Sequence, residues 1–250
     1  MNPDRKPRAL HIVTALWAIM FGVGVVVTIG KWLPVEYSWT ATITLILGAA
    51  VVVLSEARTS PRAIYRATAI IAVAGLGIES VGVLTGYPFG AYQYTGLLWP
   101  PVGVVPLAIA AAWVSTLLSS WRIASHILAR GRGVNTLLLT GGLALALDFA
   151  LEPMATRVAH YWVWTDGHIP LQNYLSWFLI GVVGAAVLGR IVPGMRMSRS
   201  AFNYAVLQWT SNLGFFLAVC WSNGVASPMI ALPALIVLIP VVRALFTRDA

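Results

Sequence analysis

Long runs of apolar residues alternate along this chain with short polar segments. Each run has about 17 to 25 residues, the length that an α-helix needs to cross a lipid bilayer. We therefore expect an all-α fold, a polytopic membrane helical bundle of about eight transmembrane helices, which forms a single domain over residues 1–250. The predicted spans are residues 9–30, 38–54, 64–85, 102–121, 134–151, 174–191, 201–221 and 228–246.

The composition is typical of an integral membrane protein. Hydrophobic residues make up 59% of the chain and charged residues 10%, whereas about a quarter of a soluble domain is charged. The net charge of +8 does not indicate nucleic-acid binding, because the basic residues stand in short clusters between the apolar runs. The first run is too long for the apolar part of a signal peptide, so we expect it to remain as the first span.

The distribution of positive charge predicts the topology. Lys and Arg collect in cytoplasmic loops, and with eight spans all sixteen of them except Lys31 and Arg157 fall on one side. Both termini are therefore predicted to be cytoplasmic, in a multi-pass protein of the cell membrane. The opposite side carries two long loops rich in Tyr, Trp, Gly and Pro, residues 85–101 and 153–173.

Three acidic residues lie within or at the end of predicted spans: Glu79 in the third, and Asp148 and Glu152 in the fifth. Asp148 and Glu152 are four residues apart, so they share a helix face. At 1.5 Å per residue, Glu79 lies about 22 Å and Asp148 about 21 Å along spans that both run outward, near the outer surface. Because ionisable groups at membrane depth are rare and costly, these acids are candidates for a functional site.

Two interpretations of the acids remain open at this point. In the first, they fasten helices together by pairing with Arg157, with loop tyrosines or with backbone donors. In the second, burial keeps one carboxyl protonated as a general acid while a neighbouring carboxylate acts as a base. The second arrangement suits the addition or removal of water across an unactivated double bond.

Other polar residues carry less information. Gln208 and Asn212 share a face of the seventh span, where they either position water or bond between helices. Glu56 is close to Arg58 and is expected to form a solvated pair at the cytoplasmic edge. The four histidines are divided between the two sides, so the ligand cluster of a membrane di-iron oxygenase is not expected. We predict neither a metal nor a cofactor.

Several stretches between residues 77 and 177 together resemble the carotenoid biosynthesis membrane proteins, a family that includes carotenoid 1',2'-hydratases and bisanhydrobacterioruberin hydratase. The combination is specific, although each stretch alone is weak. One departure is the turn over residues 166–170, which is shorter than in the family. The matching stretches are Glu79–Tyr94 (ESVGVLTGYPFGAYQY), Val105–Leu107 followed by Trp113, Asp148–Pro153, and Trp162–Trp164 with Pro170, Asn173 and Trp177.

The resemblance implies an enzyme that adds water to the terminal double bond of an acyclic carotenoid, giving a tertiary alcohol without a redox cofactor. On this hypothesis Asp148 or Glu79 donates the proton, and Glu152 activates the water. Aromatic ring faces would stabilise positive charge on the tertiary carbon. The expected substrate-binding residues are Tyr87, Phe89, Tyr92, Tyr94, Trp162, Trp164, Asn173 and Asn212.

Two other classes of protein compete with this hypothesis. A non-catalytic carotenoid or isoprenoid carrier, or a scaffold for other carotenoid-pathway enzymes, would need an apolar groove but no titratable acid. A proton-coupled transporter would also carry membrane carboxylates, but here the acids cluster near one face and no charged path leads to the cytoplasm. The expected partners are an acyclic carotenoid substrate and the lipid bilayer.

Overall fold

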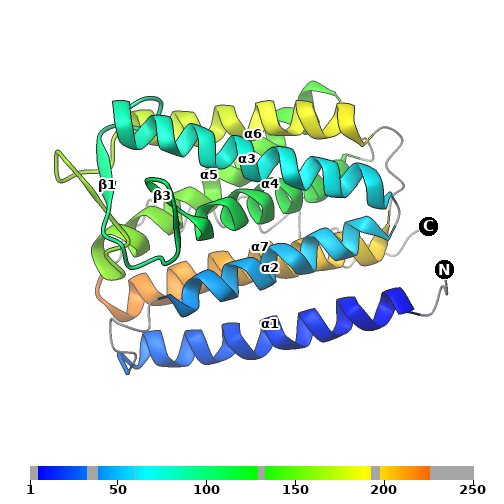
Figure 1. Ribbon diagram of the computed structural model, residues 1–250, viewed down its shortest axis with the longest axis horizontal. Helices are drawn as coiled ribbons and strands as arrows, with labels where there is room; N and C mark the ends of the chain where they lie inside the picture. The colour runs from blue at the N-terminus through cyan, green and yellow to red at the C-terminus, as the bar shows by residue number, and fades with distance from the viewer. Residues whose placement is uncertain (1–4, 33–38, 59, 129–132, 193–197, 226–250) are drawn as a thin grey trace.

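The computed structural model describes residues 5–32, 39–58, 60–128, 133–192 and 198–225 (Figure 1). Its α-helices are α1 (Arg5–Ile29), α2 (Thr40–Ala57), α3 (Pro61–Thr85), α4 (Leu107–Ile127), α5 (Val134–Pro153), α6 (Leu171–Ile191) and α7 (Arg199–Ser222). A π-helical turn, η2 (Met154–Val158), continues α5. The strands are β1 (Tyr92–Tyr94), β2 (Pro101–Val102), β3 (Val105–Pro106) and β4 (Trp162–Trp164).

The first seven predicted spans correspond to α1 to α7, and the predicted all-α class is confirmed. Helices α1 to α6 are long and apolar enough to cross a membrane. Helix α7 has 24 residues but is less apolar, since polar residues such as Gln208 and Asn212 interrupt it. The predicted eighth span, residues 228–246, lies outside the described residues, so the count of eight stays a prediction, as does the orientation of the termini.

The fourth predicted span is wrong at both ends. Helix α4 begins at Leu107 rather than Val102, because β2 pairs antiparallel with β3 just before it. Gly103, between these strands, has a φ of 64°, a left-handed conformation that glycine adopts readily. The apolar residues of this hairpin look like the first turn of a span. At its other end α4 continues beyond the predicted end, which brings Arg122 into the helix.

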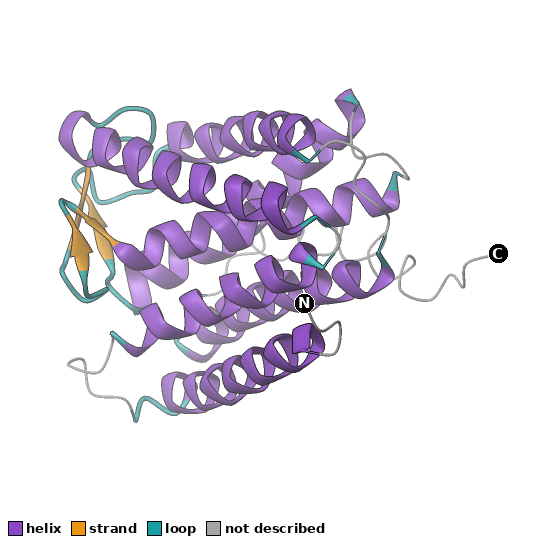
Figure 2. Ribbon diagram, turned by 45° about the vertical axis from the view of Figure 1, so that its right-hand side comes forward, coloured by secondary structure: helices purple, strands orange, loops and turns teal. Residues whose placement is uncertain are grey.

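The helices run side by side along the long axis of the molecule (Figure 1). Helix α4 is central: it packs against α2, α3, α5 and α7 and is almost wholly buried. Helix α1 lies at the edge of the bundle, against α2 and α7, and from Arg8 onward nearly all of its side chains are exposed or partly exposed. The strands gather at one end of the bundle (Figure 2), and we call this the ribbon end.

The ribbon is formed by β1 and β4, which are far apart in the sequence and pair antiparallel. Their register places Tyr92 opposite Trp164, and Tyr94 opposite Trp162. Alternate residues of a strand point to opposite faces, so these four rings share one face of the ribbon. The middle residue of each strand is exposed on the other face. The two loops that the sequence marks as aromatic therefore present a single aromatic surface to the bundle.

Helices α5 and α6 approach each other most closely at Gly141 and Gly181. A Cβ added to Gly181 would lie 2.7 Å from Gly141 Cα, and one added to Gly141 would lie 2.7 Å from the carbonyl oxygen of Phe178. Small residues allow this kind of contact between membrane helices. Gly142, the next residue along α5, has open space around the same added atom.

This contact predicts different effects for two neighbouring substitutions. We expect Gly141→Ala to destabilise the protein by about 1–3 kcal/mol, because the methyl group overpacks the α5–α6 contact. Gly142→Ala should leave stability unchanged or raise it by up to about 1 kcal/mol, because alanine favours the helix. Thermal unfolding of both variants in one detergent measures the difference. Equal melting temperatures would contradict a close contact at Gly141.

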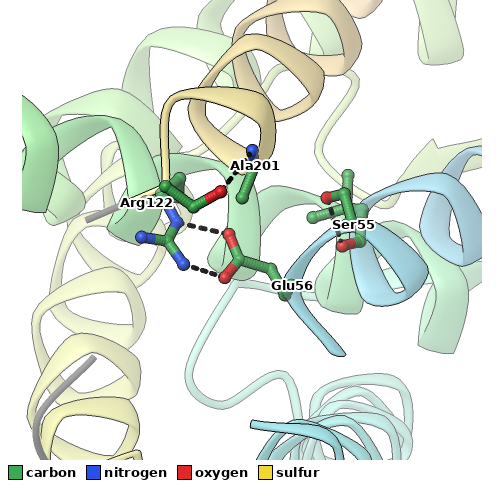
Figure 3. A network of polar contacts seen from close by, with 6 residues as sticks. Ser55, Glu56, Arg122 and Ala201 are labelled. Atoms are coloured by element: carbon green, nitrogen blue, oxygen red, sulfur yellow. Dashed lines mark hydrogen bonds and ion pairs between the residues drawn. The ribbon is translucent and has the colours of Figure 1, made fainter. Parts of the chain in front are cut away.

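Glu56 and Arg122 form a buried ion pair between α2 and α4 (Figure 3). The guanidinium Nε and Nη2 of Arg122 donate to the two carboxylate oxygens of Glu56, and the side chains are 0% (Arg122) and 1% (Glu56) exposed. This corrects two expectations: Glu56 is not a solvated partner of Arg58, which is exposed, and Arg122 is not a loop residue. The partners are 66 positions apart, so local spacing gives no sign of the pair.

Candidate active site

Glu79, Asp148 and Glu152 lie buried towards the ribbon end of the bundle. Glu79 is on α3, near its last turn, and the other two acids are on the last turns of α5. Their side chains are 6%, 0% and 2% exposed, and all three lie within range of one another's charge. Within the described ranges, no three His, Cys, Asp or Glu side chains are grouped so as to hold a metal ion.

Three donors surround the carboxylate of Glu79. The hydroxyls of Tyr92 and Tyr94 donate to Oε2 at 2.5 and 2.8 Å, and Trp113 Nε1 donates to Oε1 at 3.0 Å. Burial, and then the charge of Glu79, raise the pKa of Tyr92 and the pKa of Tyr94 above the ordinary value. Both phenols therefore keep their protons and act as donors. Charge-assisted bonds of this kind are the strong ones, so the three donors hold the Glu79 carboxyl group in place and stabilise its ionised form.

Glu152 is surrounded in a similar way by β4 and α6. Its Oε2 accepts from Trp164 Nε1 at 2.9 Å and from Trp162 Nε1 at 3.3 Å, while Oε1 accepts from Asn173 Nδ2 at 3.3 Å. The pairing of β1 with β4 explains which donors each glutamate receives. One strand supplies two phenol donors to Glu79, and its partner strand supplies two indole donors to Glu152.

Asp148 differs from both glutamates in its hydrogen bonding. Asn173 Nδ2 donates to Asp148 Oδ2 at 2.9 Å as well as to Glu152. A primary amide has two N–H groups, so one side chain in the first turn of α6 joins the two acids. The other oxygen, Asp148 Oδ1, is buried and has no hydrogen-bond partner in the part of the chain that the structure describes. Because buried polar atoms nearly always have a partner, Oδ1 is the atom of this cluster that is available to a proton or a ligand.

Aromatic rings pack around the acids. The Tyr92 and Trp164 rings are 5.1 Å apart between centroids, and Tyr94 and Trp162 meet edge-on at 6.1 Å. Phe89 meets Tyr92 edge-on at 6.3 Å. Aromatic faces carry partial negative charge and attract cations, most strongly where water is excluded. The site therefore combines carboxyl groups with surfaces that favour a transient positive charge.

A family model described as carotenoid biosynthesis protein matches residues 40–240 of the chain. The match covers well over half of the sequence and includes the ribbon and all three acids. The chain belongs to the carotenoid biosynthesis protein family. The resemblance read from the sequence motifs is thereby confirmed at the level of the family.

This carotenoid biosynthesis protein is also similar to the bisanhydrobacterioruberin hydratase of Haloarcula japonica. The two are 31% identical over 113 residues, which are 43% of this chain and 38% of that protein. The chain thus matches well under half of the length of this relative. No solved structure matches the chain.

Three residues expected near the acids of this family member form no hydrogen bond or ion pair with them in the described part of the chain. Tyr87 is 70% exposed, whereas Tyr92 is buried. Asn212 accepts a hydrogen bond from Gln208 at 3.4 Å, and within the described residues no hydrogen bond joins it to an acid. Arg157 is exposed, and no ion pair joins it to the three acids in the described ranges. An ion pair with Arg157 therefore does not hold these carboxyl groups in place.

Trp113 is the site residue that the sequence-based list of binding residues missed. Besides donating to Glu79, its ring stacks on Trp177 of α6 at 4.3 Å between centroids. Trp113 is six residues from the start of α4, and Glu79 is six residues from the end of α3, so both lie about 9 Å from the ribbon end of their helices. A comparison of depths along neighbouring helices would have placed Trp113 beside Glu79.

Proposed function

We propose that this chain adds water to the terminal 1',2' double bond of an acyclic carotenoid, giving a tertiary alcohol with no redox cofactor. The observation that carries the proposal is the buried carboxyl of Asp148. Asn173 donates to its Oδ2 and to Glu152, while its Oδ1 has no hydrogen-bond partner among the described residues. Family membership and the similarity to a bisanhydrobacterioruberin hydratase support a carotenoid as the substrate.

The hydrogen bonds support Asp148 as the proton donor. Donors stabilise the charged form of a carboxyl. From the residues that the structure describes, Glu79 and Glu152 each accept three hydrogen bonds, whereas Asp148 accepts one. In a buried cluster of three acids whose charges repel, the carboxyl with the fewest donors is the one that holds a proton most readily. We therefore assign the general acid to Asp148 and leave Glu79 ionised.

The proposed reaction has two steps. Asp148 gives its proton to the less substituted carbon of the double bond, which leaves positive charge on the tertiary carbon. A water molecule then forms a C–O bond to that carbon and loses a proton to Glu152. Return of this proton from Glu152 to Asp148 restores both acids, and Asn173 bonds to both across this path.

The surroundings of the acids suit the intermediate. An ionised Glu79 and the faces of Tyr92, Tyr94 and Trp164 would stabilise the tertiary cation. Helices long and apolar enough to cross a membrane would keep the polyene body in an apolar environment, in the cell membrane, with its end group at the ribbon end.

The first test is the reaction itself. The full chain would be expressed in cells that accumulate lycopene or another acyclic carotenoid, grown in water enriched in oxygen-18, and the pigments analysed by mass. We expect a product heavier by one labelled water molecule. A hydroxyl group that carries unlabelled oxygen would show that it came from another source and would contradict hydration. Unchanged pigment in the presence of accumulated protein would favour the carrier or scaffold.

Tyr92→Phe tests the role of the phenol donors. Loss of a hydrogen bond to a charged group costs about 1.5–3 kcal/mol, so we expect hydration to fall about 10- to 100-fold. Tyr87→Phe is the matched control, because this tyrosine belongs to the same loop but is exposed. Product formed per amount of membrane protein measures both variants. Equal activity in the two would mean that the bond to Glu79 does not serve the reaction.

A further inference from the structure

One face of the buried helix α4 is polar. The residues that form it stand at intervals of four, three and four, so they share a helix face: Ser115, Ser119, Arg122 and His126. Arg122 bonds to Glu56 of α2, and the His126 ring stacks on Phe202 of α7 at 4.0 Å. The polar face is therefore turned towards α2 and α7.

Gln208 of α7 lies beside α2, near the polar face of α4. A Cβ added to Gly48 would overlap the side-chain amide of Gln208. Helices α2 and α4 both start at the ribbon end (Figure 1). Gly48 is eight residues before Glu56, and Ser115 is seven residues before Arg122, so they lie about 12 and 10.5 Å from the ion pair along their helices. The amide of Gln208 is therefore level with Ser115.

A second count, along α7, gives nearly the same level. Gln208 is six residues from Phe202, and Ser119 is seven residues from His126, the ring that stacks on Phe202. At 1.5 Å per residue these separations are about 9 and 10.5 Å. The two counts together place the Gln208 amide between the levels of Ser115 and Ser119.

Three oxygens at this level are buried and have no hydrogen-bond partner among the residues that the structure describes: Ser115 Oγ, Ser119 Oγ and Gln208 Oε1. The side chains are 2%, 1% and 1% exposed. Hydroxyls elsewhere, such as those of Thr140 and Thr210, donate to the carbonyl one turn earlier at 2.7 Å, but these serines do not. Gln208 Oε1 is an amide carbonyl oxygen, so only a donor can satisfy it.

The geometry points to a buried water site between α2, α4 and α7, in which Ser115, Ser119 and Gln208 bind ordered water. Water both donates and accepts, so one molecule satisfies Gln208 Oε1 and a serine hydroxyl together. Buried polar groups that lack a protein partner are commonly bridged in this way. The site is separate from the three acids and does not depend on the proposed hydration. Asn212 accepts a hydrogen bond from Gln208, so it belongs with this water site and not with the substrate site.

A structure of the whole chain in lipid, at a resolution that shows ordered water, tests this site directly. We expect density within hydrogen-bond distance of Gln208 Oε1 and of Ser115 Oγ or Ser119 Oγ. A direct bond from a serine hydroxyl to Gln208 Oε1, with no density between α2, α4 and α7, would overturn the proposal.

Radiolytic labelling gives a second test that needs no crystal. X-rays generate hydroxyl radicals from trapped water, and these modify nearby side chains, which mass spectrometry detects. We expect labelling of the α4 segment around Ser115 and Ser119 to fall several-fold in Gln208→Met. It should be unchanged in Thr210→Val, because the Thr210 hydroxyl is already bonded to its own helix. Labelling that is as low in the unaltered protein as in Gln208→Met means a dry interface and overturns the site.

Discussion

The Asp148→Asn variant is expected to lose hydration by about 10²- to 10⁴-fold, the range that a positioned general acid supplies. The amide matches the carboxyl in size but has no acidic proton to give to the double bond. Among the described residues, Asp148 Oδ1 is the one carboxyl oxygen of the three acids that is buried without a hydrogen-bond partner, so it is the atom best placed to meet the substrate. Product formed from an acyclic carotenoid, per amount of membrane protein, measures the loss.

Two variants control this result. Asp166→Asn makes the same chemical change at an exposed loop position and should leave hydration unchanged. Asp148→Glu keeps the acidic proton and should retain more activity than Asp148→Asn. If Asp148→Asn, Glu79→Gln and Glu152→Gln all hydrate the carotenoid at the normal rate, the acid–base mechanism is wrong.

The Arg122→Met variant is expected to lower the free energy of unfolding by about 3–5 kcal/mol, because it removes the cation that donates to both oxygens of the buried Glu56 carboxylate. Removal of both charges, in Glu56→Gln with Arg122→Met, should restore much of the loss. A buried pair contributes little compared with an apolar replacement, whereas half a pair is strongly unfavourable. Thermal unfolding in detergent and the amount of protein in the membrane measure both effects.

Arg58→Met is the matched control for the ion pair. Arg58 is two residues from Glu56 and is exposed, and surface charges contribute about 0–1 kcal/mol. We expect its melting temperature to stay close to that of the unaltered protein. If Arg58→Met were as destabilising as Arg122→Met, the partner of Glu56 would have to be reassigned.

The sequence by itself determined the class of fold and identified the three acids as candidate site residues. A helix that crosses a bilayer must satisfy its backbone within one apolar run, so run length alone predicts α1 to α7 closely. Charged groups are conspicuous in such runs, so Glu79, Asp148 and Glu152 stand out without any structure. Their residue types also led to the proposal of acid–base chemistry. The error at the start of α4 came where apolar residues form a hairpin instead of a helix.

Only the tertiary structure decided which groups these acids meet. Asn173 joins Asp148 to Glu152 because the first turn of α6 packs beside the last turns of α5. The division of tyrosine and tryptophan donors depends on the register of β1 against β4, and the partner of Glu56 depends on the packing of α2 against α4. Apolar periodicity reports which face of an element is buried but not which element covers it, so contacts between distant segments had to come from the packed bundle.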